Sequence, residues 1–338
     1  MRILLFEYVT GGGWNEPELP TSLANEGWSM WRAVLEDLVA ESGLRVLTLL
    51  DQRLALANSF PALAQVDVLV VERAGPKELA ERLAAVARTC DAAFFIAPET
   101  DGVLATLCRQ MIGLIPTWNA SPAAIERCGD KWQTFQLWQA AEIPTIPTRL
   151  LSHIDAADYP VDHGPQVVKP RDGAGSVGLK TVSTRAAWDA FRQRICQTGT
   201  EDRWLVQPLH VGQPLSVAAL FDNGHLCELF PIAEQQLSAD GRFTYQGGCV
   251  PARHTATVIL PLIVSISQLL PGLHGYIGFD LLANESGWQF VEINPRLTSS
   301  YLGYRQLVNS PPRYLLRPGS SPLQWKSEQI VFTPTRVE

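Results

Sequence analysis

The sequence predicts an α/β domain followed by a larger α+β region. Strands and helices alternate in the first 115 of the 338 residues, which indicates a parallel sheet with helices on its faces. From residue 166 onward, short strands joined by turns predominate, a pattern typical of antiparallel sheets. We therefore expect four segments: an α/β domain at 1–115, two α+β subdomains at 116–200 and 201–310, and a tail at 311–338 that lacks readable periodicity.

In the first domain, short apolar runs alternate with longer amphipathic ones. The runs at 2–9, 46–50, 66–71 and 92–96 predict buried strands, and helices are expected at 22–42 and 76–89. Gly11, Gly12 and Gly13 follow the first strand and precede the first helix. Backbone N–H groups at such a point can bind an anion, although a simple connection explains the glycines equally well.

The second region opens with two well-marked helix starts. Ser121 is a suitable N-cap for a helix beginning at Pro122, and a second helix begins at Asp130-Lys131 and ends before Pro144. Helices are also expected at 185–197 and 255–269. The predicted strands are 166–170, 177–183, 203–208, 214–222, 225–236, 276–283 and 288–294.

Composition limits the class of protein. The chain is 46% hydrophobic and 18% charged, which is enough for folded cores, and its net charge of −7 without a basic run argues against a nucleic-acid partner. The six cysteines form no C-x-x-C pair, as expected in a reducing compartment. With no apolar stretch near 20 residues and an acidic residue early in the chain, we expect a cytoplasmic protein without membrane contact.

A strand pair late in the chain carries the clearest chemical signal. Because side chains alternate along a strand, Glu292 and Asn294 share one face, with Val291 and Ile293 turned to the core. The turn at 284–287 places Asp280 opposite Glu292. Facing carboxylates repel unless a cation lies between them, and Mg²⁺ prefers these oxygen ligands. A surface hairpin with scattered polar residues is the alternative.

A glycine-rich segment, G-x-G-x-x-G, lies earlier in the second region at 173–178. A dinucleotide site needs a helix after this motif, but residues 179–183 are β-branched and alternating, so the loop joins two strands. It is not a Walker A loop either, because Leu179 stands where the lysine should be. A glycine loop between strands can cover phosphates, and Lys169 just upstream can neutralise one. A tight glycine hairpin is the alternative.

Together with the strand at 203–208, these motifs resemble the ATP-grasp superfamily of carboxylate–amine ligases. The matching segments occur in the family's order over 119–300: Asp130-Lys131, Val168-Lys169-Pro170, Val206-Gln207-Pro208-Leu209, Gly278-Phe279-Asp280 and Glu292-Ile293-Asn294-Pro295-Arg296. The resemblance implies an ATP-grasp fold preceded by a Rossmann-like pre-ATP-grasp sheet, ATP as co-substrate, and Mg²⁺, usually two ions, with Mn²⁺ as a substitute.

The resemblance also implies roles for individual residues. Lys131 and Lys169 would hold ATP phosphates, and Arg296 would meet the transferring phosphoryl group; Asp280, Glu292 and Asn294 would bind the metal. A mobile lid would include Gly173, Gly175, Ser176 and Gly178, and the backbone of Gln207, Pro208 and Leu209 would read adenine. No acidic residue follows the adenine segment at 212–216, so a ribose ligand is left unassigned.

A narrower likeness concerns residues 6–13, 26–30 and 294–303, which look like the tyramine–glutamate ligase branch of methanofuran-type coenzyme synthesis. This implies small-molecule substrates, an amino-acid carboxylate and an amine, and it allows a homodimer. Gly11 to Gly13, Arg253 and Arg305 are candidate substrate contacts, with surface roles as the alternative. Rival interpretations are a peptide or D-alanine-type ATP-grasp ligase, a dinucleotide-dependent oxidoreductase, and a nucleotide-binding protein without catalysis.

Overall fold

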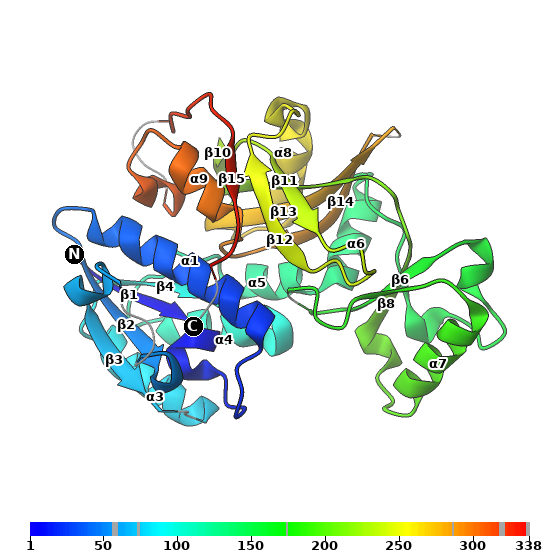
Figure 1. Cartoon of the computed structure of the whole chain (residues 1–338), viewed down its shortest axis with the longest axis horizontal. Helices are drawn as coiled ribbons and strands as arrows, with labels where there is room; N and C mark the ends of the chain where they lie inside the picture. The colour runs from blue at the N-terminus through cyan, green and yellow to red at the C-terminus, as the bar shows by residue number, and fades with distance from the viewer. Residues whose placement is uncertain (56–59, 73–74, 174, 286, 318–321, 336–338) are drawn as a thin grey trace.

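The computed structural model describes residues 1–55, 60–72, 75–173, 175–285, 287–317 and 322–335. Three lobes are visible in Figure 1: a parallel sheet with its helices (blue and cyan), a small lobe with α7 (green), and an antiparallel sheet (yellow to red). The predicted α/β domain and α+β region are therefore both present in the described residues.

The first lobe contains a parallel sheet with the order β3-β2-β1-β4. Its strands are β1 (Arg2–Glu7), β2 (Arg45–Asp51), β3 (Asp67–Val71) and β4 (Ala92–Ile96). Successive residues of β1 enter different cores: Leu5 packs with Trp28 of α1 (Thr21–Val39), whereas Leu4 packs with Leu83 of α3 (Pro76–Ala87). Helices thus cover both faces, which explains the continuous apolar strands.

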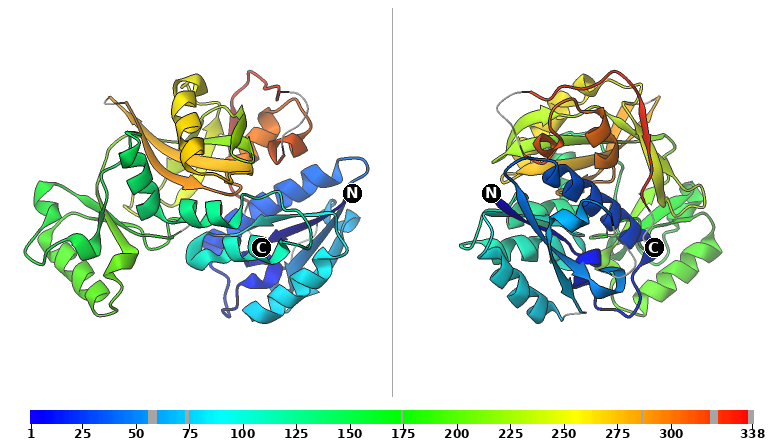
Figure 2. Two further views of the ribbon diagram at one scale, coloured as in Figure 1. Left: turned by 180° about the vertical axis from the view of Figure 1, so that it is seen from behind. Right: turned by 60° about the vertical axis from the view of Figure 1, so that its left-hand side comes forward.

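The central lobe is an antiparallel sheet with the order β14-β13-β9-β11-β12-β15, in which β10 pairs with β9. Its strands are β9 (Gln213–Asp222), β10 (His225–Leu229), β11 (Ala233–Leu237), β12 (Tyr245–Val250), β13 (Gly275–Asn284), β14 (Gly287–Asn294) and β15 (Ile330–Phe332). Seen from behind, α8 (Leu260–Leu269, yellow) lies against β13 and β14 (Figure 2), where Ile263 and Ile266 share a core with Phe279.

The small lobe is a four-stranded antiparallel sheet in the described residues, with the order β5-β8-β6-β7. Its elements are β5 (Arg149–Leu150), β6 (Gln166–Pro170), β7 (Lys180–Val182), β8 (Trp204–Pro208) and α7 (Arg185–Cys196). Trp188 and Phe191 of α7 pack on Val168 and Val206 in a separate core. The small lobe therefore has a hydrophobic core separate from those of the other two lobes.

Two short helices connect the lobes: α5 (Pro122–Gly129) and α6 (Lys131–Ala140). Ser121 caps α5 by accepting a hydrogen bond from the Ala124 N–H, as predicted. Asp130 caps α6 and also forms an ion pair of 2.6 Å with Arg171, next to the glycine loop. The cap therefore fixes Lys131, the first residue of α6, relative to β6.

Several predicted boundaries were wrong. The strand predicted at 225–236 is two strands, β10 and β11, because Pro231 between them cannot donate to a ladder. The helix predicted at 255–269 begins at Leu260, with Pro261 in its first turn. The strand predicted at 177–183 is confined to β7, because residues 175–178 still form a turn.

Several helices and strands of the described residues were not predicted. They include α2 (Gln52–Ala55), α4 (Val103–Met111), β5, β12, α9 (Tyr301–Leu307) and β15. Within β12, a Cβ on Gly248 would lie 2.3 Å from the Glu234 carbonyl oxygen, so glycine permits a close strand approach. The unreadable tail supplies β15, which pairs with β12, and Thr335 then reaches Ser29 of α1 with its N–H donating at 2.6 Å.

Candidate active site

The pair β13–β14 holds Asp280 directly opposite Glu292, as the sequence predicts. The register shifts by one residue just beyond this pair, and Val291 becomes the extra residue of a bulge. The prediction that Val291 turns to the core is therefore wrong: it lines a cavity beside Glu292, while Phe290 and Ile293 are buried. Because of the bulge, the consecutive residues Val291 and Glu292 of β14 both line the same cavity.

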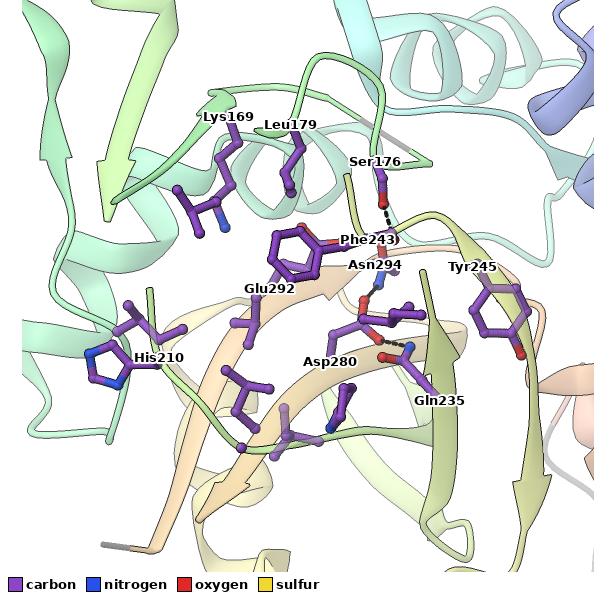
Figure 3. A pocket seen from close by; sticks show the side chains of 18 of the residues that line it. Lys169, Ser176, Leu179, His210, Gln235, Phe243, Tyr245, Asp280, Glu292 and Asn294 are labelled. Atoms are coloured by element: carbon purple, nitrogen blue, oxygen red, sulfur yellow. Dashed lines mark hydrogen bonds between the residues drawn. The ribbon is translucent and has the colours of Figure 1, made fainter. Parts of the chain in front are cut away.

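Asp280 is held on both carboxylate oxygens. Gln235 Nε2 donates to Oδ1 at 2.9 Å and Asn294 Nδ2 donates to Oδ2 at 3.0 Å (Figure 3). Burial, followed by the charge of Glu292, raises the pKa of Asp280 to about 7. Two partly buried carboxylates and an amide oxygen suit a hard divalent cation, which would also relieve the repulsion between the carboxylates. The donor set therefore fits Mg²⁺, although the described residues contain no cluster of three His, Cys, Asp or Glu arranged for a metal.

Two lysines face this carboxylate pair. Lys169, on β6, is 4% exposed, and burial lowers its pKa to about 8. Lys131 Nζ lies 3.6 Å from Glu292 Oε2 and also donates a hydrogen bond to the Gly173 carbonyl. Burial alone would raise the pKa of Glu292, but the two lysines outweigh it and hold the pKa below its usual value. The site therefore joins cations from the small lobe and the connecting helix α6 to anions from the central sheet.

A cavity of about 410 Å³ lies between the small lobe and the central sheet. One end is mostly apolar and includes Ile146, Val167 and Leu282 beside Gln207, Pro208 and Leu209. The amide of Gln207 is turned away, since Nε2 donates to Thr148 Oγ1 at 2.7 Å. The Leu209 N–H already donates to the Pro165 carbonyl at 2.8 Å, so it is engaged within the protein.

The glycine loop runs from β6 to β7 and covers the cavity. The strands it joins are antiparallel, so the helix that a dinucleotide site requires after the motif is absent over residues 180–182. Gly175 and Gly178 have φ of +61° and +78°, and Ser176 Oγ donates to the Phe243 carbonyl at 2.9 Å (Figure 3). Gly175, Ser176 and Leu179 line the cavity, whereas Ala174 lies outside the described residues.

Arg296 closes the end of the cavity next to the parallel-sheet lobe. Its guanidinium Nε lies 2.9 Å from a carboxylate oxygen of Glu99, which follows β4. Glu26 of α1 lines the same end, with Ser299 Oγ donating to it at 3.5 Å. The sequence reasoning missed Glu26 and Glu99 because both belong to the first lobe, more than 150 residues from the motif they meet. It also missed Tyr245 and Gln235, whose strands are adjacent only in the folded sheet.

The structure does not bring the predicted glycines Gly11, Gly12 and Gly13 to the cavity. They form a buried turn over Val9–Gly13, eight residues before α1 starts, so they are not at a helix N-terminus. A Cβ on Gly11 would lie 2.5 Å from the Phe6 ring, which shows that packing requires glycine. The nearby anion is Glu7, which accepts from the Thr10 N–H and hydroxyl at 2.6 Å.

The two arginines proposed as substrate contacts also lie elsewhere. Arg305 forms a 2.5 Å ion pair with Asp37 of α1 and a 3.3 Å pair with Glu36, which fastens α9 to α1. Arg253 is exposed after β12 and is not among the described residues that line the cavity. Neither side chain is placed to meet a substrate in this cavity, so both predictions are corrected.

Comparisons with known proteins agree with this arrangement. Residues 128–300, more than half of the chain, match the ATP-grasp domain family, and residues 44–125 match the pre ATP-grasp 3 domain. The chain belongs to the ATP-grasp family. It is 22% identical to tyramine–L-glutamate ligase of Methanocaldococcus jannaschii over 98% of this chain and 94% of that protein. It is 23% identical to the enzyme of the same name from Methanocaldococcus fervens, over 98% and 99%.

A solved structure supports the fold. N5-carboxyaminoimidazole synthetase from Staphylococcus aureus, complexed with ADP, superposes with a TM-score of 0.67 at 13% identity over 96% of this chain and 79% of that one. Membership of this family confirms the predicted fold class. It also confirms the predicted enzyme class, which is an ATP-dependent, ADP-forming carbon–nitrogen ligase. In the described part of the chain, none of the helices has the length and apolar character required to cross a bilayer.

Proposed function

We propose that this ligase joins the carboxylate of glutamate to the amine of tyramine, or of a tyrosine-like compound, through an acyl phosphate. Two observations support the substrates and the chemistry. The similarity to tyramine–L-glutamate ligases extends over 98% of the chain. One cavity also joins Lys169, the Asp280–Glu292 pair and Arg296, the groups that phosphoryl transfer to a carboxylate requires. The second observation carries the proposal, because it is specific to this chain.

The apolar end of the cavity would take the adenine ring, with the backbone from Gln207 to Leu209 at its edge. The triphosphate would then extend under the glycine loop toward Lys169 and Lys131. Both ammonium groups face Glu292, so bound phosphates would place anions on each side of the lysines. The pKa of Lys169 would consequently rise on nucleotide binding, because a nearby anion stabilises the ammonium form.

Asp280, Glu292 and Asn294 would hold Mg²⁺, with two ions expected and Mn²⁺ as a substitute. A bound ion of this kind neutralises charge that develops on the phosphate oxygens. Gln235 and Asn294 fix the orientation of the Asp280 carboxylate through the two hydrogen bonds described above. The protein thereby presents ligand oxygens toward the cavity before any nucleotide enters.

In the first step, the substrate carboxylate oxygen attacks the γ-phosphorus, the bond to the β–γ bridging oxygen breaks, and ADP leaves. Arg296 is positioned to hold the transferring phosphoryl group. In the second step, the amine nitrogen attacks the acyl carbon, phosphate leaves, and the nitrogen loses a proton to give the amide. Acyl phosphates hydrolyse readily, so the closed loop over the cavity would protect the intermediate from water.

The test is phosphate release from ATP and Mg²⁺ with purified protein. Glutamate is combined with tyramine, tyrosine, phenethylamine and an alkylamine, and the same amines are combined with D-alanine and with dipeptides. We expect release only when glutamate and a phenolic amine are both present, with the amide identified by mass spectrometry. Release with D-alanine or a peptide, and none with the glutamate pairs, would refute these substrates and assign a peptide-type ligase instead.

A further inference from the structure

One cavity carboxylate is not accounted for by the proposed metal site. Among the described residues that line the cavity, the carboxylates are Asp280, Glu292 and Glu26, and the first two are assigned to the metal. Glu26 is partly buried on α1, and among the described residues no lysine, arginine or histidine nitrogen forms an ion pair with it. Burial raises the pKa of Glu26 and the charge of Arg296 lowers it, but the Arg296 guanidinium is already paired with Glu99, so the Glu26 carboxylate has no ion-pair partner of its own in the described part of the chain. The position therefore suits a cation supplied by a ligand.

A second group at the same end lacks a partner. The Tyr245 hydroxyl on β12 is buried and makes no hydrogen bond with the described residues. It lines the cavity, and Figure 3 shows it on the side away from Lys169 and His210. After desolvation, the charge of Glu26 is the largest influence that raises the pKa of Tyr245, which indicates that the two side chains face one region. A buried hydroxyl without a partner is expected to meet a ligand or water.

The glycine loop encloses this region. A Cβ on Gly175 would lie 2.5 Å from Leu23 Cδ2 and 4.0 Å from Glu26 Oε1, so the loop meets α1 beside this carboxylate. Ser299 Oγ approaches Glu26 from the segment that follows Arg296. A molecule held here is therefore surrounded by α1, the loop and β12, next to the arginine expected to hold the phosphoryl group.

We propose that Glu26, with Ser299 and Tyr245, binds the primary ammonium group of a substrate and thereby positions that substrate beside Arg296. This inference rests on the proposed ligase function and adds the residue that recognises a cationic substrate. Lys131 and Lys169 lie where phosphates are expected, whereas Glu26 lies at the other end, beside Arg296, where it can bind a cation from the substrate. Both glutamate and tyramine carry such a group, through the α-ammonium of the first and the amine of the second.

The experiment compares wild type with Glu26→Gln, which keeps the side-chain shape and removes the charge. The matched control is Glu36→Gln, which removes a carboxylate from the same helix outside the cavity, where Glu36 pairs with Arg32 at 2.9 Å. The KM values for glutamate, amine and ATP are measured by ADP formation. Since loss of a charged hydrogen bond weakens binding by roughly 10- to 100-fold, we expect that rise in KM for one ammonium substrate. The KM for ATP should stay within about twofold of the wild-type value. In the control variant, the KM values for glutamate, amine and ATP should all stay within about twofold of wild type.

The pattern of changes identifies the source of the ammonium group. If only the KM for the amine rises, Glu26 binds the ammonium group of the amine substrate. If only the KM for glutamate rises, Glu26 binds the α-ammonium group of glutamate. A purely structural role would instead lower the melting temperature and change kcat with all KM values, so thermal unfolding is recorded alongside. Tyr245→Phe, which removes only the hydroxyl, should raise the same KM by about threefold to tenfold.

The experiment separates failure of the ammonium site from failure of the proposed substrates. If wild type turns over and Glu26→Gln leaves both KM values unchanged, the ammonium site is overturned while the ligase function stands. If wild type releases no phosphate with glutamate and tyramine, the proposed substrates fall. The Glu26→Gln comparison is then made with the carboxylate and amine pair that the panel identifies, and the same two outcomes decide it.

Discussion

Lys169 offers a test in which fold stability and nucleotide affinity change in opposite directions. Burial lowers its pKa from 10.5 to about 8 in the protein without nucleotide. A tenfold change in an ionisation constant is worth about 1.4 kcal/mol, so holding this ammonium charged at neutral pH opposes folding by about 3 kcal/mol. Lys169→Met removes that penalty and should stabilise the fold. The same substitution removes a phosphate contact and should weaken ATP binding roughly 10- to 100-fold.

The pH dependence of ATP binding follows from the same pKa. Below pH 8 the free protein carries the ammonium form, and ATP affinity should be nearly flat. Above pH 8 the free protein loses the proton, and nucleotide binding must take it up again. At pH 9 only about one-tenth of the protein is protonated, so the apparent Kd should rise about tenfold. For stability the sign is opposite: the pKa is depressed in the fold, so the penalty is full below pH 8 and disappears as the pH rises toward 10.5.

Calorimetric titration with a nonhydrolysable ATP analogue, in buffers of different ionisation enthalpy, measures both Kd and proton uptake. Lys180→Met is the control, because Lys180 lies on the adjacent strand β7, opposite Val168, and is not among the cavity residues. It should leave Kd within about twofold. A flat Kd between pH 7 and 9 in wild type, or an unchanged affinity in Lys169→Met, would refute the assignment of Lys169 to a phosphate.

Three further predictions concern other parts of the site and its support. Glu292→Gln should lower Mg²⁺-dependent turnover roughly 100-fold or more at every Mg²⁺ concentration, and wild-type rates in a metal titration would contradict the ligand assignment. Ser176→Ala removes the loop contact to Phe243 and should raise the KM for ATP by about threefold to tenfold with an unchanged melting temperature, whereas an unchanged KM would count against a closing loop. Burial raises the pKa of Glu7 from 4.5 to about 7, so the charge of Glu7 opposes folding increasingly as the pH rises from 4.5 to 7. In urea unfolding, Glu7→Gln should therefore be more stable than wild type by about 3 kcal/mol at pH 8 and by much less at pH 5. Equal gains in stability at the two pH values would refute this assignment.

Local patterns in the sequence were sufficient to predict that Asp280, Glu292 and Asn294 lie together. Strand periodicity placed Glu292 and Asn294 on one side, and the turn at 284–287 brought Asp280 close to Glu292, although Ser286 of this turn lies outside the described residues. The exact pairing of Asp280 with Glu292 also needs the bulge at Val291, which shifts the register by one residue. The β-branched run after the glycine motif correctly predicted a strand at that point. These features depend on neighbouring residues in the chain, and short-range sterics and hydrogen bonding determine them.

Longer-range features could not be read in the same way. The bulge at Val291 and the close approach at Gly248 arise from strand pairing that single-strand patterns do not specify. Arg305 looked like a substrate contact, yet Asp37 of α1, 268 residues away, neutralises it. Gly11 to Gly13 looked like an anion loop, yet the chain provides its own anion in Glu7. The partner of Arg305 is distant in sequence, so its identity depends on how the lobes pack, whereas Glu7 is near in sequence and only the fold shows that it turns toward this loop.

The sequence by itself determined which residues are candidates for holding phosphate and metal, because those side chains belong to neighbouring strands and loops whose geometry is largely local. Only the tertiary structure decided what lies at the other end of the cavity. Glu26 and Tyr245 line the cavity together with Arg296, and Glu99 pairs with Arg296, because α1, the segment after β4, and β12 are packed together by a shared apolar core. Burial of apolar surface is not directional, and it brings together residues that no spacing in the chain relates.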